Sequence, residues 1–193
     1  MSRDVQILRA AAKLFADRGF AGVGVDEIGK EAGVTGPAIY RHFSGKDEIL
    51  ATLCDDALDQ LVSLTNKDFE DAWDQLSHLV AGHGSFVVSH GSLAGVWIRE
   101  GRLLSDASRL HVYRRQRAYI QRWSTTIARC LPHHAEDEHL TLTFAALGML
   151  NSIATWPPAA RRADPVGLLL RSVLDGLRGL SREPAQARTK PGA

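Results

Sequence analysis

Apolar residues recur along this chain at spacings of three and four, while strict alternation of apolar and polar residues never persists. Such spacing gathers apolar side chains on one face of an α-helix, whereas alternation is typical of strands. The first clear case covers residues 3–18, and Gly19 is a natural end for it. Its apolar face consists of Ile7, Leu8, Ala11, Leu14 and Phe15. The pattern predicts an all-α fold.

Two short helices are predicted next, at residues 25–32 and 36–43, with Gly33 between them. A break at residues 44–46 precedes a longer helix with apolar residues on one side from Ile49 to Leu64. Three helices, of which the last two are joined by a tight turn, are typical of a helix-turn-helix unit. We therefore predict a helix-turn-helix domain at residues 1–46.

The remaining chain predicts a larger helical domain at residues 47–182. Proline cannot continue a helix interior, so Pro132 and the pair Pro157–Pro158 mark turns. The expected helices lie at 68–90, 92–102, 105–130, 136–156 and 164–180, which makes about nine in all. Residues 183–193 contain proline and glycine and are expected to form a disordered tail.

The segment around the predicted turn has the capping chemistry of a helix-turn-helix. Gly24 stands at an N-cap position, and Glu27 lies where its carboxylate can reach back to a backbone N–H. Gly33 can adopt the left-handed conformation that reverses the chain tightly. Thr35 is a favourable N-cap for the next helix, and Pro37 falls in its first turn, where no N–H is needed. The sequence thus predicts binding to double-stranded DNA through residues 25–43.

Polar residues beyond the predicted recognition helix suit a phosphate backbone. Tyr40 and His42 can each donate a hydrogen bond, and Lys46 adds a cation at the start of the next helix. The alternative is a plain three-helix packing unit with no role in DNA binding. The ordered run of turn glycine, capping threonine, Tyr-Arg-His and lysine argues against that alternative.

The first turn of the recognition helix bears on how bases are recognised. Gly36 and Pro37 have no hydrogen-bonding side chain. We therefore expect contact with thymine methyls, close backbone approach and recognition of DNA shape, with Arg41 as the polar residue that reaches a base.

Composition narrows the class of protein. The formal net charge is +1, so a nucleic-acid site must arise from local placement of basic groups. The two cysteines, Cys54 and Cys130, suggest neither a disulfide framework nor a metal-type pair, which favours a reduced, cytoplasmic setting. We see no secretory signal and no uncharged apolar stretch long enough for a membrane span.

The run AGVTGPAIYRHFSGKDEIL resembles the signature of TetR-family transcriptional regulators, and residues 5–50 follow that family's pattern. The resemblance implies a homodimer with a divergent carboxy-terminal domain for ligand binding and dimerisation. It also implies a repressor of a pseudo-palindromic operator, with an activator as the alternative. Gly24, where the family more often has threonine, and Gly36, often a larger polar residue, depart from the pattern. The family's DNA-contacting positions fall on Thr35, Gly36, Pro37, Tyr40, His42 and Lys46.

The last two predicted helices, 136–156 and 164–180, carry more apolar surface than one buried face requires. Such an excess suggests a subunit interface, and a two-fold dimer is the commonest kind. The resemblance implies a four-helix bundle across the dimer axis. The alternative is an ordinary internal core.

Residues 99–130 contain eight arginines and only two acidic residues. One interpretation is a solvated basic face at Arg115, Arg122 and Arg129. The other is a pocket for an amphipathic anionic effector such as a fatty acid or acyl-coenzyme A. A filled core would instead favour control by a protein partner. Candidate pocket residues are Trp97, Arg99, Arg109, Tyr113, Arg117, Trp123 and Phe144.

An enzyme is the rival class. The run HHAEDEH at residues 133–139 gathers possible metal ligands, but consecutive residues at a helix start point apart, and acidic residues are favoured there in any case. The nucleophile-elbow, phosphate-loop and dinucleotide motifs are missing from the sequence. We expect no catalytic residue, metal or cofactor.

Overall fold

The computed structural model describes residues 2–104, 106–157 and 164–182. These residues form nine α-helices and two short 3₁₀ turns without a strand, which confirms the all-α prediction. The helices are α1 (Arg3–Arg18), α2 (Val25–Ala32), α3 (Gly36–Ile39), α4 (Lys46–Thr65), α5 (Ala72–Ser89), α6 (Gly91–Glu100), α7 (Asp106–Cys130), α8 (Glu136–Ser152) and α9 (Pro165–Ser181). The turns are η1 (Gly101–Leu103) and η2 (Ile153–Thr155).

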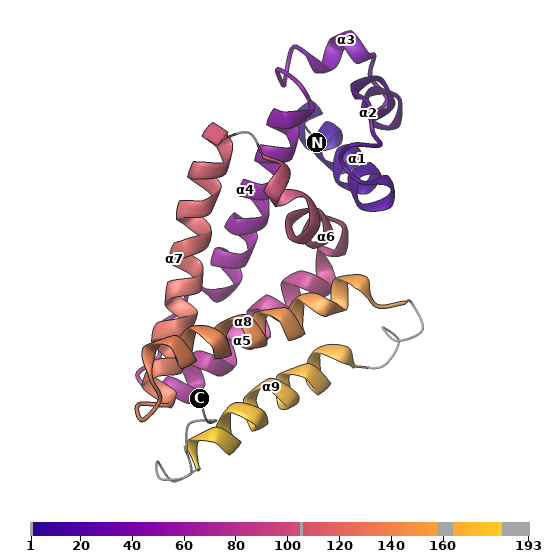
Figure 1. Ribbon diagram of the computed structural model, residues 1–193. Helices are drawn as coiled ribbons and strands as arrows, with labels where there is room; N and C mark the ends of the chain where they lie inside the picture. The colour runs from indigo at the N-terminus through magenta and orange to yellow at the C-terminus, as the bar shows by residue number, and fades with distance from the viewer. Residues whose placement is uncertain (1, 105, 158–163, 183–193) are drawn as a thin grey trace, which may run out of the picture.

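The first three helices gather at one end of the molecule, and α4 runs from them toward α5 and α8, with α9 at the opposite end (Figure 1). The apolar face predicted for α1 is the one that is buried: Ile7 and Phe15 are inaccessible to solvent and pack with Ile28, Ile39 and Ile49 from the next three helices. Burial of these aliphatic and aromatic side chains holds the unit together.

Helix α5 is the centre of the remaining bundle, where it packs against α4, α7, α8 and α9. Its core includes Leu76, Phe86, Trp123, Ile127 and Leu150, all shielded from solvent. Helix α6 packs against α1 and α4 on the one hand and against α5 and η2 of this bundle on the other. It therefore connects the two ends of the molecule.

Helix limits differ from the prediction where a cap or a tighter turn intervenes. Helix α5 begins four residues after the predicted start because the Asp71 carboxylate accepts hydrogen bonds from the backbone N–H groups of Trp73 and Asp74. Helix α8 ends at Ser152, and η2 tightens the last turn. The predicted tail at 183–193 lies outside the described residues.

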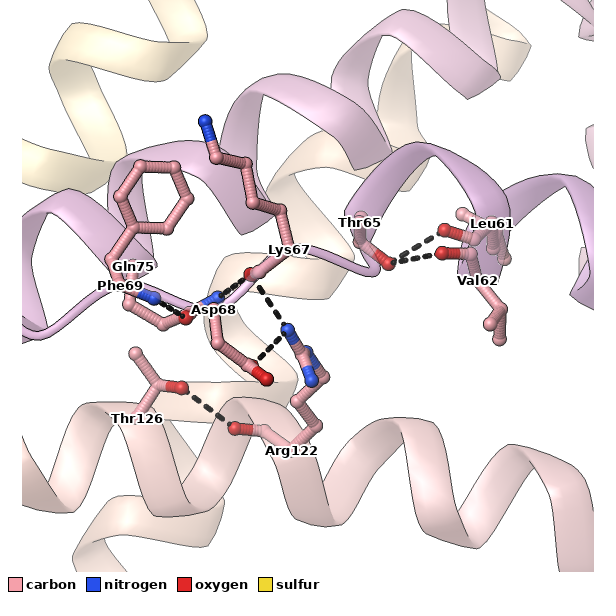
Figure 2. A network of polar contacts seen from close by, with 9 residues as sticks. All are labelled: Leu61, Val62, Thr65, Lys67, Asp68, Phe69, Gln75, Arg122 and Thr126. Atoms are coloured by element: carbon pink, nitrogen blue, oxygen red, sulfur yellow. Dashed lines mark hydrogen bonds and ion pairs between the residues drawn. The ribbon is translucent and has the colours of Figure 1, made fainter.

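Three arginines of α7 tie this helix to the middle of α4 and to the loop after α4. Arg115 donates to Asp55 at 2.8 Å and also pairs with Asp59. Arg122 donates to the carbonyl of Lys67 and to the Asp68 carboxylate, at 2.8 and 2.9 Å (Figure 2).

Arg129 continues the series by donating to the carbonyl of Glu70 at 2.5 Å. Gln75 of α5 also holds this loop: it donates to the Lys67 carbonyl and accepts from the N–H of Phe69 (Figure 2). The interpretation of Arg115, Arg122 and Arg129 as a solvated basic face was therefore wrong. Their partners come from segments distant in sequence, and these contacts clamp α7 onto α4 and the loop.

Candidate nucleic-acid interface and effector hollow

The turn between α2 and α3 has the geometry expected from its sequence. Gly33 adopts a left-handed conformation with φ 68° and ψ 31°, which side-chain-bearing residues rarely adopt. The N–H of Val34 then donates to the carbonyl of Gly29 at 2.9 Å. At the start of α2, the Glu27 carboxylate accepts from the N–H of Gly24 at 2.9 Å, as predicted. These contacts fix where α3 lies relative to α2.

Helix α3 is shorter than predicted, since it ends at Ile39 rather than near residue 43. The N–H groups of His42 and Phe43 both donate to the Ile39 carbonyl, at 2.8 and 2.9 Å. Shared use of one carbonyl converts the end of the helix into a tight turn. The turn directs Tyr40 and Arg41 outward, while Ile39 is fully buried.

The outward surface of this unit carries several of the predicted DNA residues. Tyr40 is 60% exposed, and Thr35, Pro37 and Arg41 are exposed as well. Within the described residues, the Thr35 hydroxyl does not cap α3, and neither Tyr40 nor Arg41 has a side-chain partner. At Gly36, a Cβ would meet the Asp26 carboxylate at 1.9 Å, so α2 and α3 approach closely there. The arrangement leaves hydroxyl and guanidinium donors available on one surface.

His42 is held by the first helix. Its imidazole Nδ1 lies 2.6 Å from the Asp4 carboxylate, and one third of its side chain is exposed. Nothing in the sequence pointed to Asp4 beyond its place in a first helical turn, where acids are generally favoured. The pairing therefore adds Asp4 to the candidate interface.

Lys46 is turned toward the protein. Its ammonium donates to the carbonyls of Phe20 and Val23, at 3.1 and 3.2 Å, and lies 4.4 Å from the centre of the Phe20 ring. In this position the cation closes the loop between α1 and α2 onto the start of α4. Its expected contact with phosphate would compete with these internal contacts.

Three of the predicted effector residues surround one hollow. Trp97 of α6 meets Arg109 and Tyr113 of α7 around a space of about 130 Å³, which η1 also lines. Typical ligand pockets measure about 300–1,000 Å³, so this hollow is small. A guanidinium next to an aromatic wall offers both an ionic and an apolar contact.

The other four predicted effector residues lie elsewhere. Arg99 donates to the carbonyl of Ala16 at 2.9 Å, which joins α6 to α1. Arg117 lines a separate cleft between α7 and α8. Trp123 is fully buried in the bundle core, and Phe144 is 54% exposed on α8. The structure therefore brings only three of the seven candidates together, because each helix distributes its side chains over several faces.

The buried core of the bundle includes a polar group. His83 Nδ1 lies 3.0 Å from the Tyr119 hydroxyl, and Nε2 lies 2.9 Å from Asn151 Oδ1. All partners are satisfied if Nε2 donates to Asn151 and Tyr119 donates to Nδ1. Burial lowers the pKa of His83 to about 4, although the contact with Asn151 opposes the shift. The imidazole is therefore neutral near pH 7.

The histidine-rich run of the sequence is engaged locally. His139 Nε2 contacts the carbonyl of Leu131 at 2.9 Å, and His134 lies 3.6 Å from Glu138. Among the described residues, no three or more His, Cys, Asp or Glu side chains are grouped so that they could hold a metal ion. In the same part of the chain, no helix is both long and apolar enough to span a membrane.

Comparison with protein-family models gives two matches. Residues 7–53 match the family described as bacterial regulatory proteins, tetR family. Residues 70–158 match the tetracyclin repressor-like, C-terminal domain. The two matched segments include the helix-turn-helix and most of the helical bundle.

Individual proteins agree with these matches. The chain is 37% identical to the HTH-type transcriptional activator FasR of Mycolicibacterium smegmatis over 81 residues, which is 42% of this chain and 37% of that protein. The chain spans less than half the length of the curated relatives that it matches.

Two solved structures share the fold at identities too low to show more. PfmR, a TetR family regulator from Thermus thermophilus, has a TM-score of 0.80 and 24% identity, covering 91% of this chain and 99% of its own. AibR, solved in complex with isovaleryl coenzyme A and operator DNA, has a TM-score of 0.76 and 21% identity, covering 93% and 97%.

Proposed function

Because this chain belongs to the TetR family of transcriptional regulators, we propose that it is a repressor that binds a pseudo-palindromic operator as a homodimer and releases it when an effector binds. The observation that carries the proposal is the exposed surface of the helix-turn-helix, where Tyr40 and Arg41 project beyond a turn fixed by Gly33. A hydroxyl and a guanidinium there suit phosphate and base edges, respectively.

A titration of labelled DNA from the flanks of the gene tests the DNA-binding part directly. The wild-type protein should bind this DNA more tightly than a scrambled duplex of equal length. Tyr40→Phe removes one hydroxyl and should weaken binding by roughly three- to tenfold, as expected for one hydrogen bond. Lys30→Gln, at an exposed residue on α2, is the control. Equal affinity for both duplexes would contradict the proposal.

The proposed dimer uses α8 and α9, which lie side by side (Figure 1). Large apolar side chains are exposed on them at Leu140, Phe144, Met149 and Leu168. Exposed apolar surface on two adjacent helices favours a self-complementary contact. A dimer would present two recognition helices about 34–36 Å apart, as successive major grooves require.

The proposed effector is a small amphipathic acid or acyl thioester in the hollow formed by Trp97, Arg109 and Tyr113. Arg109 would bind the acidic group or carbonyl, and the two aromatic side chains would contact the acyl chain. The volume of about 130 Å³ suits a short acyl group better than a long fatty acid. The relative AibR, whose complex contains isovaleryl coenzyme A, supports this size class.

Effector binding would reach the DNA-binding unit through α6. This helix borders the hollow at Trp97 and hydrogen-bonds to α1 through Arg99 and Ala16. A ligand that fits only one position of α6 would shift the population of domain orientations, and affinity for two half-sites would fall.

Calorimetry with isovaleryl coenzyme A tests the effector proposal. Binding should be lost in Arg109→Gln and retained in Arg114→Gln, which alters an exposed neighbour on the same helix. Added isovaleryl coenzyme A should also release DNA from the wild-type protein. If the wild-type protein does not bind isovaleryl coenzyme A, the effector proposal is contradicted, whereas the DNA-binding proposal is unaffected.

Control by a protein partner is the second candidate. The bundle core is filled around Trp123 and His83, and the hollow near Trp97 is small. Retention of DNA in the presence of short acyl thioesters and acids would favour this candidate.

A further inference from the structure

A second cleft, separate from the hollow at Trp97, lies where α1 meets α4 and the junction of α5 with α6. Its volume is about 470 Å³, within the usual range for small-molecule sites. Leu8 of α1, Leu53 of α4 and Leu93 of α6 give it apolar lining. The cleft and the hollow have no lining residue in common. The cleft is thus formed jointly by the DNA-binding unit and the helical body.

Asp56 brings a carboxylate to this cleft from α4. Its neighbours Asp55 and Asp59 both pair with Arg115 of α7, whereas Asp56 has no hydrogen bond or ion pair among the described residues. The side chain is only partly exposed. Burial, together with Asp59 and Asp55, raises the pKa of the Asp56 carboxyl above its ordinary value. A partly buried acid without a partner favours a ligand that supplies a cation.

The opposite charge comes from Arg9 on α1. Lys13, one turn further along this helix, is paired with Glu31 at 2.6 Å, but Arg9 has no such partner in the described chain. The cleft also borders His90, whose buried Nδ1 atom lacks a hydrogen-bond partner in the same residues. One cation and one anion therefore face the cleft from different helices, each available to a ligand.

We propose that this cleft binds a small amphipathic zwitterion, with its ammonium group at Asp56, its carboxylate at Arg9 and its apolar part against Leu8, Leu53 and Leu93. Each charged end would then form an ion pair, and the desolvated carboxylate of Asp56 would gain the partner that it lacks. Free amino acids with aliphatic or aromatic side chains have this chemistry.

A ligand in this position contacts α1 and α4 at once, so its binding depends on how the DNA-binding unit sits on the body. The ligand would stabilise the orientation of the DNA-binding unit in which the cleft is closed, because it binds that orientation more tightly than any other. The cleft would thus give a second input to DNA affinity besides the hollow at Trp97.

Calorimetry on the full chain without DNA tests the site. The probes are L-leucine and L-phenylalanine. Leucinamide and phenylalaninamide lack the carboxylate, and 4-methylpentanoate and 3-phenylpropanoate lack the ammonium. At least one amino acid should bind, and its two truncated analogues should bind at least about tenfold more weakly, since each loses a charged hydrogen bond.

Variants of the two charged residues test whether the amino acid binds in this cleft. Asp56→Asn and Arg9→Gln should each weaken amino-acid binding by at least about tenfold. Asp56→Glu, which restores the charge, should recover part of it. The matched controls Asp17→Asn and Arg114→Gln change exposed charges outside the cleft and should leave it unchanged.

Binding of neither amino acid at millimolar concentration would overturn the proposal. So would binding that Asp56→Asn and Arg9→Gln leave unchanged. Because these measurements contain no DNA and no acyl thioester, their failure is independent of the proposed regulatory function.

Discussion

The imidazole Nδ1 of His42 lies 2.6 Å from the Asp4 carboxylate, which links the turn after α3 to the first turn of α1. When Nδ1 donates to Asp4, Nε2 is the ring nitrogen left to meet a phosphate, and it can donate there only in the imidazolium form, in which both nitrogens carry a proton. The helix that we propose enters the groove, α3, has only four residues, so contacts outside it must hold the turn that follows. Asp4 is therefore a positioning residue for the proposed interface.

Two variants of Asp4 separate positioning from charge. Asp4→Ala should weaken operator binding by roughly three- to tenfold, because His42 loses the acceptor that orients it. Asp4→Asn keeps an acceptor oxygen and removes a negative charge near DNA, so affinity should be preserved or raised. Fluorescence anisotropy with a labelled operator measures both. Tighter binding by both variants would mean that Asp4 acts only through its charge.

Lys46 has a structural role that can be distinguished from a phosphate contact. Lys46→Met removes the hydrogen bonds to the Phe20 and Val23 carbonyls, so the free energy of unfolding should fall by about 1–3 kcal/mol. Urea denaturation followed by circular dichroism measures this loss. Lys30→Met, at an exposed position on α2, should change stability little. Normal stability of Lys46→Met combined with lost DNA affinity would instead support the phosphate contact that the family resemblance implies.

A substitution at Phe144 tests the proposed dimer interface. Phe144→Asp places a charge on the exposed apolar surface of α8, so the dimer should dissociate at micromolar concentration. Analytical ultracentrifugation measures the mass. Leu103→Asp, at an exposed apolar residue of η1, is the control and should remain dimeric. A dimer that is insensitive to Phe144→Asp would place the interface elsewhere. A monomeric wild-type protein would contradict the proposed dimer itself.

The lowered pKa of His83 predicts that the free energy of unfolding depends on pH. Its pKa is about 4 when folded and about 6.5 when unfolded, so between these values the unfolded chain binds more protons. Stability should consequently fall as the pH is lowered from about 6.5 toward 4, by an amount on the order of 3 kcal/mol. Urea midpoints across this range measure it. His83→Gln should flatten the dependence, while His133→Gln, at an exposed residue, should not. An unchanged slope in His83→Gln would assign the dependence to other groups.

Local chemistry explains why the sequence predicts the helices and the turn so well. Gly33, Thr35 and Pro37 each have conformational preferences that act within a few residues, and all three stand where the sequence placed them. The same preferences did not reveal the early end of α3, because the shared Ile39 carbonyl depends on how the following turn packs.

Contacts between residues that are distant in the sequence could not be predicted from the sequence patterns. Lys46 lies more than twenty positions from the two carbonyls that it binds, and Asp4 lies far from His42. Helical periodicity placed Arg115 on one face of α7 but contained no information about Asp55 on α4. Such partners follow from the way the helices pack, which periodicity within a single helix does not specify.

Selection of bound sequences from a random duplex library tests the central claim most directly. After several rounds with the wild-type protein, we expect enrichment of an inverted repeat whose half-site centres are separated by about one helical turn, 10–10.5 base pairs, or a multiple of it. The combined variant Tyr40→Ala and Arg41→Ala should not enrich this repeat. A wild-type pool without any common sequence, or one that the double variant enriches equally, would contradict the assignment of this surface as the DNA-binding site.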